Sequence, residues 1–333
     1  MKKLLFTLAV AGSIAACGSI VPRDYVTLQG KISNKNSDSL VIGQRSIIKT
    51  IKVGSDGVFS DTLKVKPGLY VIFDGSEQTK VYLKNGYDLK VSVDAKKFDH
   101  TIKYNGNGAN ANNYLAEKTL LEQKLLDYDS IISLKKPDFD IKMQVVKSEM
   151  YSLLEKAKAL DTSFVRTEKM SIDQVLQQTI SAYEEKQSLL ALNGKSSPKF
   201  NDYENFAGGM VSFDDLKGKY VYIDLWATWC GPCKAEIPYL KDIEKKYHNG
   251  NIKFVSISID KKTSYEKWRK MVKEMELSGI QLYANEDESF MKSYMVTGIP
   301  RFILIDPQGL IISADAPRPS DKALVELLSR YKI

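Results

Sequence analysis

Short hydrophobic runs separated by turn residues occupy residues 25–104. The turns contain pairs such as Asp56-Gly57 and Asn85-Gly86, which favour tight reversals between strands. The pattern predicts strands at residues 47–53, 58–65, 69–73, 80–83 and 87–93. We therefore expect an antiparallel β domain over residues 25–104, built as a sandwich or a partial barrel. It carries no recognisable catalytic constellation.

The pattern then changes to the spacing of amphipathic helices. Residues 105–113, which are rich in asparagine and glycine, are predicted to form a loop. Helical spacing begins near Leu115, is interrupted at Pro137, and resumes at residues 141–159 and 172–192. The aliphatic stripes fit core packing better than a coiled-coil dimer, because no heptad repeat is sustained. Residues 105–197 are thus expected to be a helical segment that ends in a linker at residues 193–198.

Strands and helices alternate in the remaining residues, 198–333. Aromatic and β-branched residues predict a buried strand at residues 220–226, and apolar spacing predicts a helix at residues 234–247. The same criteria predict strands at residues 252–259, 280–283, 301–306 and 310–313, and helices around Trp268, at residues 288–294 and after the capping pair Ser320-Asp321. These elements define a separate C-terminal domain.

Cys230 and Cys233 lie between the predicted strand at 220–226 and the helix at 234–247. Free backbone N–H groups and the positive end of the helix dipole favour a thiolate at such a junction. Cys230 is therefore the expected attacking thiol. Pro232 suits the first helical turn, where a fixed φ and a missing N–H do no harm, and Cys233 follows one turn inward as the resolving thiol.

A lone Cys-x-x-Cys pair also fits half of a zinc site. Zinc needs four ligands and the chain offers no second pair, so no metal is expected. Covalent haem attachment needs a histidine after the second cysteine, where Lys234 stands. The formal net charge is +7, but lysines and acids are mixed along the chain, which gives nucleic-acid binding little support.

The residues around the cysteines resemble the TlpA-like (ResA-like) branch of the thioredoxin family. The resemblance is carried by Lys217-Gly218-Lys219, Trp226-Ala227-Thr228-Trp229, Cys230-Gly231-Pro232-Cys233 and Lys234-Ala235-Glu236-Ile237-Pro238. It implies that residues 198–333 have a thioredoxin-like α/β fold, with a central mixed sheet flanked by helices, and act as a protein-disulfide oxidoreductase. It implies no cofactor beyond a redox-active disulfide between Cys230 and Cys233.

The resemblance also assigns roles to residues outside the motif. Asp224 matches the family's buried carboxylate, which would accept the proton of Cys233 during resolution. The alternative, a polar strand residue facing water, fits poorly with its apolar neighbours. Gly298-Ile299-Pro300 matches the family's loop with a cis-proline facing the cysteines. The backbone beside Pro300 would hold a substrate strand by β-type pairing.

Residues close to the motif are open to two interpretations. Glu236, one turn past the cysteines, either tunes their ionisation or faces solvent. Trp226 and Trp229 are expected to pack, with Trp229 also contributing to a substrate-contact surface. Gly231-Pro232 is the thioredoxin-type dipeptide and indicates a reductant.

The N-terminus has the pattern of an export signal. Two lysines precede the apolar run at residues 4–11, which is too short to span a membrane. Ile14-Ala15-Ala16-Cys17 resembles a bacterial lipobox, so residues 1–16 would be removed and the thiol of Cys17 lipidated. Residues 17–24 would then be a tether, and Cys230 and Cys233 the only free thiols. The alternative is a plain cleavable signal with an incidental cysteine.

These features predict a membrane-anchored, exported thiol–disulfide oxidoreductase that reduces disulfides of cell-envelope proteins. Its expected partners are exported cysteine-containing proteins, with apocytochrome c implied by the resemblance, and a membrane electron donor. Gly18, where aspartate would signal inner-membrane retention in some bacteria, favours the outer membrane.

Two other functions remain open. One is an envelope disulfide oxidase or isomerase, and the other is a tethered envelope-binding lipoprotein whose redox pair is regulatory. The β domain resembles the β-rich domain of unknown function that precedes many lipoprotein thioredoxins, which suggests a spacer, docking or substrate-presenting role.

Overall fold

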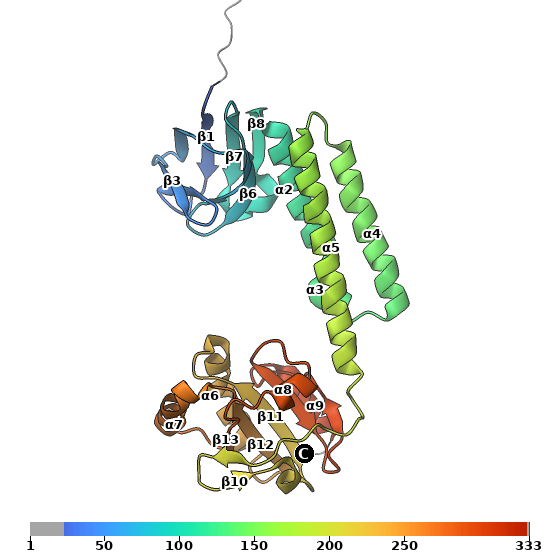
Figure 1. Cartoon of the computed structure of the whole chain (residues 1–333). Coiled ribbons are helices and arrows are strands. Elements are labelled where there is room, and N and C mark those ends of the chain that lie inside the picture. The colour runs from blue at the N-terminus through green and yellow to red at the C-terminus, as the bar shows by residue number, and fades with distance from the viewer. Residues whose placement is uncertain (1–22, 332) are drawn as a thin grey trace, which may run out of the picture. The chain divides into compact units, whose positions relative to one another are not determined.

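Figure 1 shows the computed structural model, which describes residues 23–331 and 333. The chain divides into two compact units, Met1–Thr179 and Ile180–Ile333, so the boundary lies inside helix α5 (Thr162–Leu190). The predicted signal peptide, Cys17 and most of the predicted tether lie outside the described residues. Within those residues, no helix is both long and apolar enough to cross a membrane.

The first unit begins with a β sandwich of two four-stranded sheets. One sheet has the order β4 (Val58–Leu63), β1 (Val26–Ser33), β7 (Asp88–Asp94) and β8 (Lys103–Asn107); the other has the order β3 (Ile47–Lys52), β2 (Ser39–Gly43), β5 (Gly68–Phe73) and β6 (Gln78–Leu83). Two short helices, η1 (Ala95–Lys97) and α1 (Phe98–Thr101), connect β7 to β8. The predicted antiparallel pairing is confirmed except between β1 and β7, which run parallel.

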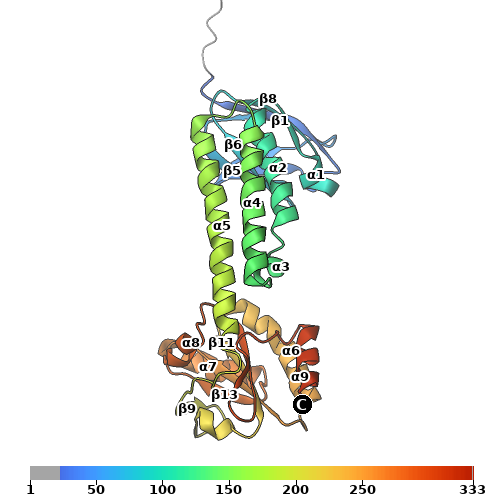
Figure 2. The same cartoon turned by 90° about the vertical axis from the view of Figure 1, so that its right-hand side faces the viewer.

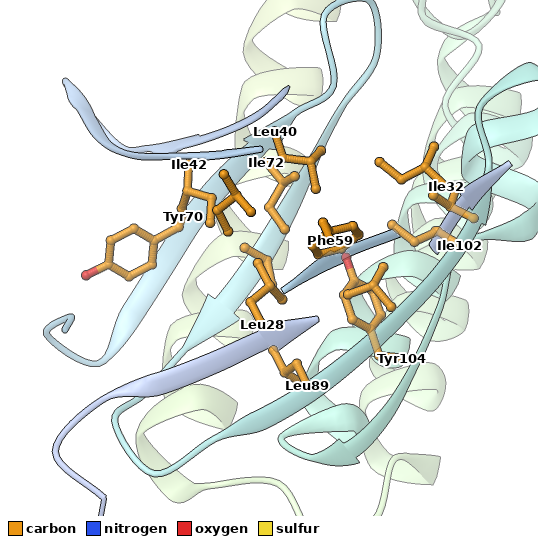
Figure 3. Packing of buried hydrophobic residues seen from close by; sticks show 14 of the residues in the cluster. Leu28, Ile32, Leu40, Ile42, Phe59, Tyr70, Ile72, Leu89, Ile102 and Tyr104 are labelled. Carbon is orange, nitrogen blue, oxygen red and sulfur yellow. The ribbon is translucent and has the colours of Figure 1, made fainter. Parts of the chain in front are cut away.

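The two sheets enclose one hydrophobic core. Side chains alternate between the faces of a strand, and Val26, Leu28 and Ile32 of β1, which share one face, are buried. Figure 3 shows Leu28 and Phe59 from one sheet lying toward Ile72 from the other. Of the two predicted arrangements, a sandwich or a partial barrel, the chain forms the sandwich.

The prediction of a loop at residues 105–113 is wrong. Residues up to Asn107 belong to β8, and helix α2 (Ala109–Leu125) begins two residues later. The side-chain amide of Asn112 accepts a hydrogen bond from the Tyr82 N–H (2.7 Å) and donates one to the Tyr82 carbonyl (3.0 Å). Asn113 makes the same pair of bonds to Tyr104, each 2.8 Å long. These asparagines therefore pair with β6 and β8, the edge strands of the two sheets.

Three further helices complete the helical segment: α3 (Tyr128–Ile132), α4 (Lys136–Lys156) and α5. The predicted interruption at Pro137 is the start of α4, where proline suits the first turn. Helix α5 begins ten residues before the predicted position, because Phe164 packs against Tyr82 and Glu168 forms a buried ion pair with Lys118 (2.8 Å). Helices α4 and α5 lie side by side in Figures 1 and 2.

The second unit is built on a seven-stranded mixed sheet, as the thioredoxin-like prediction requires. Its order is β10 (Met210–Val211), β9 (Tyr203–Asn205), β13 (Ile280–Tyr283), β12 (Ile252–Ser258), β11 (Tyr220–Trp226), β14 (Arg301–Ile305) and β15 (Ile311–Ser313). The helices are η2 (Phe213–Leu216), α6 (Gly231–Lys246), η3 (Lys262–Ser264), α7 (Tyr265–Glu274), α8 (Ser289–Ser293) and α9 (Lys322–Arg330). The β9–β10 hairpin was not predicted.

The residues predicted to link the domains are hydrogen-bonded within the second unit. The backbone N–H of Gly194 donates to the Ile311 carbonyl (2.7 Å), and that of Ser197 donates to the Gly309 carbonyl (2.8 Å). An isolated antiparallel bridge joins Ser196 to Leu310. This stretch therefore extends the β14–β15 hairpin.

Strand β11 lies inside the sheet and is buried on both faces. Val221, Ile223 and Leu225 belong to the hydrophobic cluster on one face. Tyr222 belongs to the cluster on the opposite face, which includes Leu240 of α6 and the buried leucines of α9. Because side chains alternate along a strand, Asp224 shares the α6 face with Tyr222.

Substitution of Asn112 tests whether the two asparagines hold the sandwich edges. Asn112→Ala should lower the free energy of unfolding by about 2–4 kcal/mol, because two backbone groups of Tyr82 lose partners worth about 1–3 kcal/mol each when buried. Asn110→Ala is the matched control, since Asn110 is exposed on the same helix, and should change stability by less than about 0.5 kcal/mol. Equal effects in urea unfolding would contradict the edge-pairing role.

Candidate active site

Cys230 and Cys233 form a disulfide at the start of α6, and three residues separate Cys230 from the end of β11. Cys230 is the N-cap residue of α6, and its sulfur accepts a hydrogen bond from the backbone N–H of Cys233 (3.1 Å). Both cysteines are only 3% exposed. Exposure therefore does not distinguish the attacking from the resolving thiol, and the distinction must come from what each sulfur faces.

The loop at Gly298-Ile299-Pro300 faces Cys230. The Ile299–Pro300 peptide bond is cis, as the family resemblance predicts. The Cys230 sulfur lies 3.8 Å from the Ile299 carbonyl oxygen. Residues far apart in the sequence thus meet at the cysteine expected to attack.

Asp224 and Cys233 line the same small internal cavity. Asp224 is only 7% exposed, so the predicted burial is confirmed. Burial, followed by the charges of Glu244 and Glu236, raises the pKa of Asp224 from its ordinary value of 3.8 to about 8, against a lowering hydrogen bond from Ser256. A carboxyl group with this pKa can exchange a proton near neutral pH.

Glu236 is buried, so the solvent-facing interpretation of this residue is wrong. Its carboxylate accepts hydrogen bonds from the backbone N–H (3.0 Å) and the hydroxyl (2.9 Å) of Ser320, and lies 3.9 Å from the Arg318 guanidinium. It therefore ties α6 to the segment before α9. The negative charge of Glu236 contributes to the raised pKa of Asp224.

Exposed residues surround the buried disulfide. Trp229 is 62% exposed, whereas Trp226 is buried. Gly231 and Pro232 are also exposed, and Trp229 lines a surface cavity of about 520 Å³ together with Ile259 and Met291. Of the two tryptophans, only Trp229 is available to contact another protein.

The Redoxin family model matches residues 192–326. The Thiol-disulfide oxidoreductase ResA of Bacillus thuringiensis subsp. konkukian is 29% identical over 139 residues, which cover 41% of this chain and 77% of that protein. ResA of Bacillus subtilis is 28% identical over 122 residues, covering 36% of this chain and 64% of that protein. The matched residues form a TlpA/ResA-like thiol–disulfide oxidoreductase domain.

Solved structures from Bacteroides are also similar to this oxidoreductase. A solution structure from Bacteroides vulgatus is 48% identical, covering 41% of this chain and 91% of that one, with a TM-score of 0.38. A thiol-disulfide oxidoreductase from Bacteroides fragilis is 27% identical, covering 41% of this chain and 99% of that one, with a TM-score of 0.37.

The oxidoreductase also contains a buried polar group that sequence analysis missed. Asp260 accepts hydrogen bonds from the backbone N–H of Thr228 (2.9 Å), the Thr228 hydroxyl (2.8 Å) and the Ser258 hydroxyl (2.8 Å). These bonds hold the loop that leads from β11 into Cys230. Asp260 follows β12 directly, and β12 runs parallel to β11, so both residues lie at the same sheet edge. Predicting that β11 and β12 are neighbouring parallel strands would have placed Thr228 and Asp260 close together.

Glu244 is the second missed residue. It is buried on α6, four residues after Leu240, as Glu236 is four residues before it. This spacing places both glutamates beside the apolar stripe of the helix, a pattern visible in the sequence. Its charge is the largest charge effect on the pKa of Asp224.

The raised pKa of Asp224 predicts a pH-dependent stability. The folded protein keeps this proton up to about pH 8 and the unfolded chain only up to about pH 3.8, so stability falls as pH rises between these values and then levels. Asp224→Asn removes the group whose ionisation lowers stability as pH rises. With the Cys230–Cys233 disulfide intact, the variant should be more stable than the wild type by a few kcal/mol at pH 8. This follows from about 1.4 kcal/mol per pKa unit.

Urea unfolding at several pH values measures this difference. The control is Asp242→Asn, since Asp242 is exposed on α6, and it should leave the pH dependence of the wild type intact. A gain from Asp224→Asn that does not grow between pH 4 and pH 8 would contradict the burial effect.

Proposed function

We propose that this protein is an exported, lipid-anchored reductant of disulfides in cell-envelope proteins. The observation that carries the proposal is the asymmetry of the redox pair. Cys230 faces the Pro300 loop and the exposed Trp229 side, whereas Cys233 lines an internal cavity with Asp224. One sulfur is therefore placed to meet a partner, and the other to exchange a proton with a buried carboxyl.

In the proposed reaction, the Cys230 thiolate attacks one sulfur of a partner disulfide, and the other partner sulfur leaves as a thiolate. Cys233 then attacks the Cys230 sulfur and gives its proton to the Asp224 carboxylate. The bond between Cys230 and the partner breaks, so the partner leaves fully reduced and Cys230–Cys233 is oxidised. Two electrons from a membrane dithiol donor restore the reduced pair.

The start of α6 supports the first step. The backbone N–H of Cys233 already points to the Cys230 sulfur, and the positive end of a 16-residue helix lies at the same place. Both favour a negative charge on Cys230. Gly231-Pro232, the thioredoxin-type dipeptide, supports the reducing direction.

The surroundings of the disulfide support a protein substrate. The Pro300 loop presents backbone for β-type pairing with an extended strand, which accepts many sequences. Trp229 and its neighbouring cavity offer apolar contact beside the sulfurs. Exported cysteine proteins, with apocytochrome c among them, fit this chemistry.

The proposed location rests on the N-terminal sequence. The lipobox-like Ile14-Ala15-Ala16-Cys17 supports a lipid anchor, and Gly18 supports the outer membrane. The β sandwich and helices of the first unit would then serve as a spacer or a docking module between the membrane and the oxidoreductase.

Removal of the resolving thiol tests the order of the two steps. Cys233→Ser should accumulate covalent complexes between Cys230 and envelope cysteine proteins, because the mixed disulfide can form but cannot be resolved. Non-reducing gels of cells expressing the variant would show these adducts, and reductant would dissolve them. Cys230→Ser is the matched control and should trap far less, because its remaining thiol lines the internal cavity. Equal trapping by both variants would contradict the assignment.

The reduction potential of the Cys230–Cys233 pair tests the direction. A reductant should have a potential near the thioredoxin value of about −270 mV, whereas an oxidant lies near about −120 mV. Fluorescence of Trp226 and Trp229 in thiol redox buffers measures the value. A potential at the oxidising end would overturn the reducing direction in favour of an oxidase or isomerase.

A further inference from the structure

Asp224 can accept the Cys233 proton only after it has lost its own. Asp224 is buried and lines an internal cavity together with Cys233 and Trp226. At pH 7, below its pKa of about 8, most of this carboxyl group carries a proton, so a group between Asp224 and solvent that removes this proton would speed the resolution step. This inference rests on the proposed function, because it concerns the same resolution step.

Two adjoining cavities mark such a path. The inner cavity, of about 10 Å³, is lined by Asp224 and Cys233. A surface cavity of about 750 Å³ is lined by exposed residues, among them Asp242 and His248. Three residues line both cavities: Lys241, Glu244 and Ser278. Of these, Glu244 carries the carboxyl group that can receive a proton from Asp224.

Glu244 is held in place between the two cavities. The hydroxyl of Ser278 donates a hydrogen bond to its carboxylate. A Cβ atom at Gly279 would lie 2.7 Å from a Glu244 carboxylate oxygen, so glycine makes room for this group. The Lys241 ammonium instead donates to the Met275 carbonyl (3.1 Å).

The ionisation of Glu244 suits a relay. Burial raises the pKa of Glu244, while the Ser278 hydrogen bond and the Lys241 charge lower it. The negative charge of Glu244 raises the pKa of Asp224, so a negatively charged Glu244 favours the protonated form of Asp224.

Two of the residues that line the inner cavity carry an oxygen atom that can accept a hydrogen bond. Asp224 Oδ1 and Gln281 Oε1 are buried and have no hydrogen-bond partner among residues 23–331 and 333. The side-chain amide nitrogen of Gln281 donates a hydrogen bond to the Ser278 carbonyl (2.7 Å). A volume near 10 Å³ is at the lower limit for one water molecule, which would bridge such acceptors.

We propose that Glu244 is a positioning residue that relays the proton of Asp224 to solvent and so prepares Asp224 for the resolution step. Asp224 gives its own proton to Glu244 through the inner cavity, and Glu244 gives it to water in the surface cavity. When Cys233 then attacks, its proton moves to Asp224, a sulfur–sulfur bond to Cys230 forms, the Cys230–partner bond breaks, and the partner leaves as a thiolate. No electron passes through either carboxyl.

The resolution step can be timed with 5,5′-dithiobis(2-nitrobenzoate) and the reduced full chain. Attack by Cys230 releases a first chromophoric thiolate at a rate that depends on reagent concentration. Attack by Cys233 releases the second at a rate that does not. Glu244→Gln should leave the first phase unchanged and slow the second about tenfold at pH 7, less than the ~10²–10⁴-fold contribution of a direct general base.

The matched control is Glu326→Gln, an exposed acid on α9 that lines neither cavity, which should leave both phases unchanged. If Glu244 acted only by its charge, Glu244→Gln would lower the pKa of Asp224 and make more of its carboxylate available. The second phase would then be unchanged or faster at pH 7. That result would overturn the relay.

A second variant separates proton transfer from structural damage. Glu244→Ala opens space between the cavities, so added formate should restore the second phase in proportion to its concentration. Formate should not restore Asp224→Asn, because the first acceptor is then missing. A slow Glu244→Ala second phase that ignores formate would overturn the relay. A wild-type chain with no second phase would contradict the proposed exchange mechanism itself.

Discussion

The burial of β11 on both faces is the constraint on which the active site depends. A central strand with helices on one side and apolar side chains on the other shields from bulk solvent the one carboxylate it carries, Asp224. The same strand leads through a three-residue loop, held by hydrogen bonds between Thr228 and Asp260, into the cysteines, so the buried acid and the redox pair are close along the chain as well as in space. The desolvation of Asp224 and its distance from solvent follow from this geometry.

Helix α6 also influences the ionisation of the Cys230 sulfur and of Asp224. Its N-terminus holds the disulfide, and its buried face carries Glu236 and Glu244 on either side of Leu240. The two glutamates have different partners: Glu236 is bonded to Ser320, and Glu244 to Ser278 at the border of two cavities. Helix α6 thus favours a negatively charged Cys230 sulfur at its N-terminus. The charges of its two glutamates favour a protonated Asp224. These effects suit an attacking thiolate and a proton acceptor that works near neutral pH.

The first unit shows how side chains can replace backbone pairing. Asn112 and Asn113, adjacent near the start of α2, each pair with both backbone groups of one residue in an edge strand, Tyr82 in β6 and Tyr104 in β8. The asparagine-rich run has the composition of a loop, yet its amides make the hydrogen bonds that a neighbouring strand would make at these two residues. The same helix carries Lys118, whose buried ion pair with Glu168 fixes the start of α5. Composition alone could not reveal either feature, because Asn112 and Lys118 pair with residues 30 and 50 positions away along the chain.

Local patterns in the sequence determined the elements and the chemistry near the cysteines. The bounds of β11 and β13, the helix after Cys230 and the cap at Asp321 were predicted because periodicity, propensity and capping act over a few residues. The family resemblance added Asp224 and the cis bond before Pro300. Only the tertiary structure decided that Glu236 is buried, that Asp260 holds the loop before Cys230, and that Glu244 stands between two cavities. These depend on which strands and helices become neighbours, and burial and charge act through space rather than along the chain.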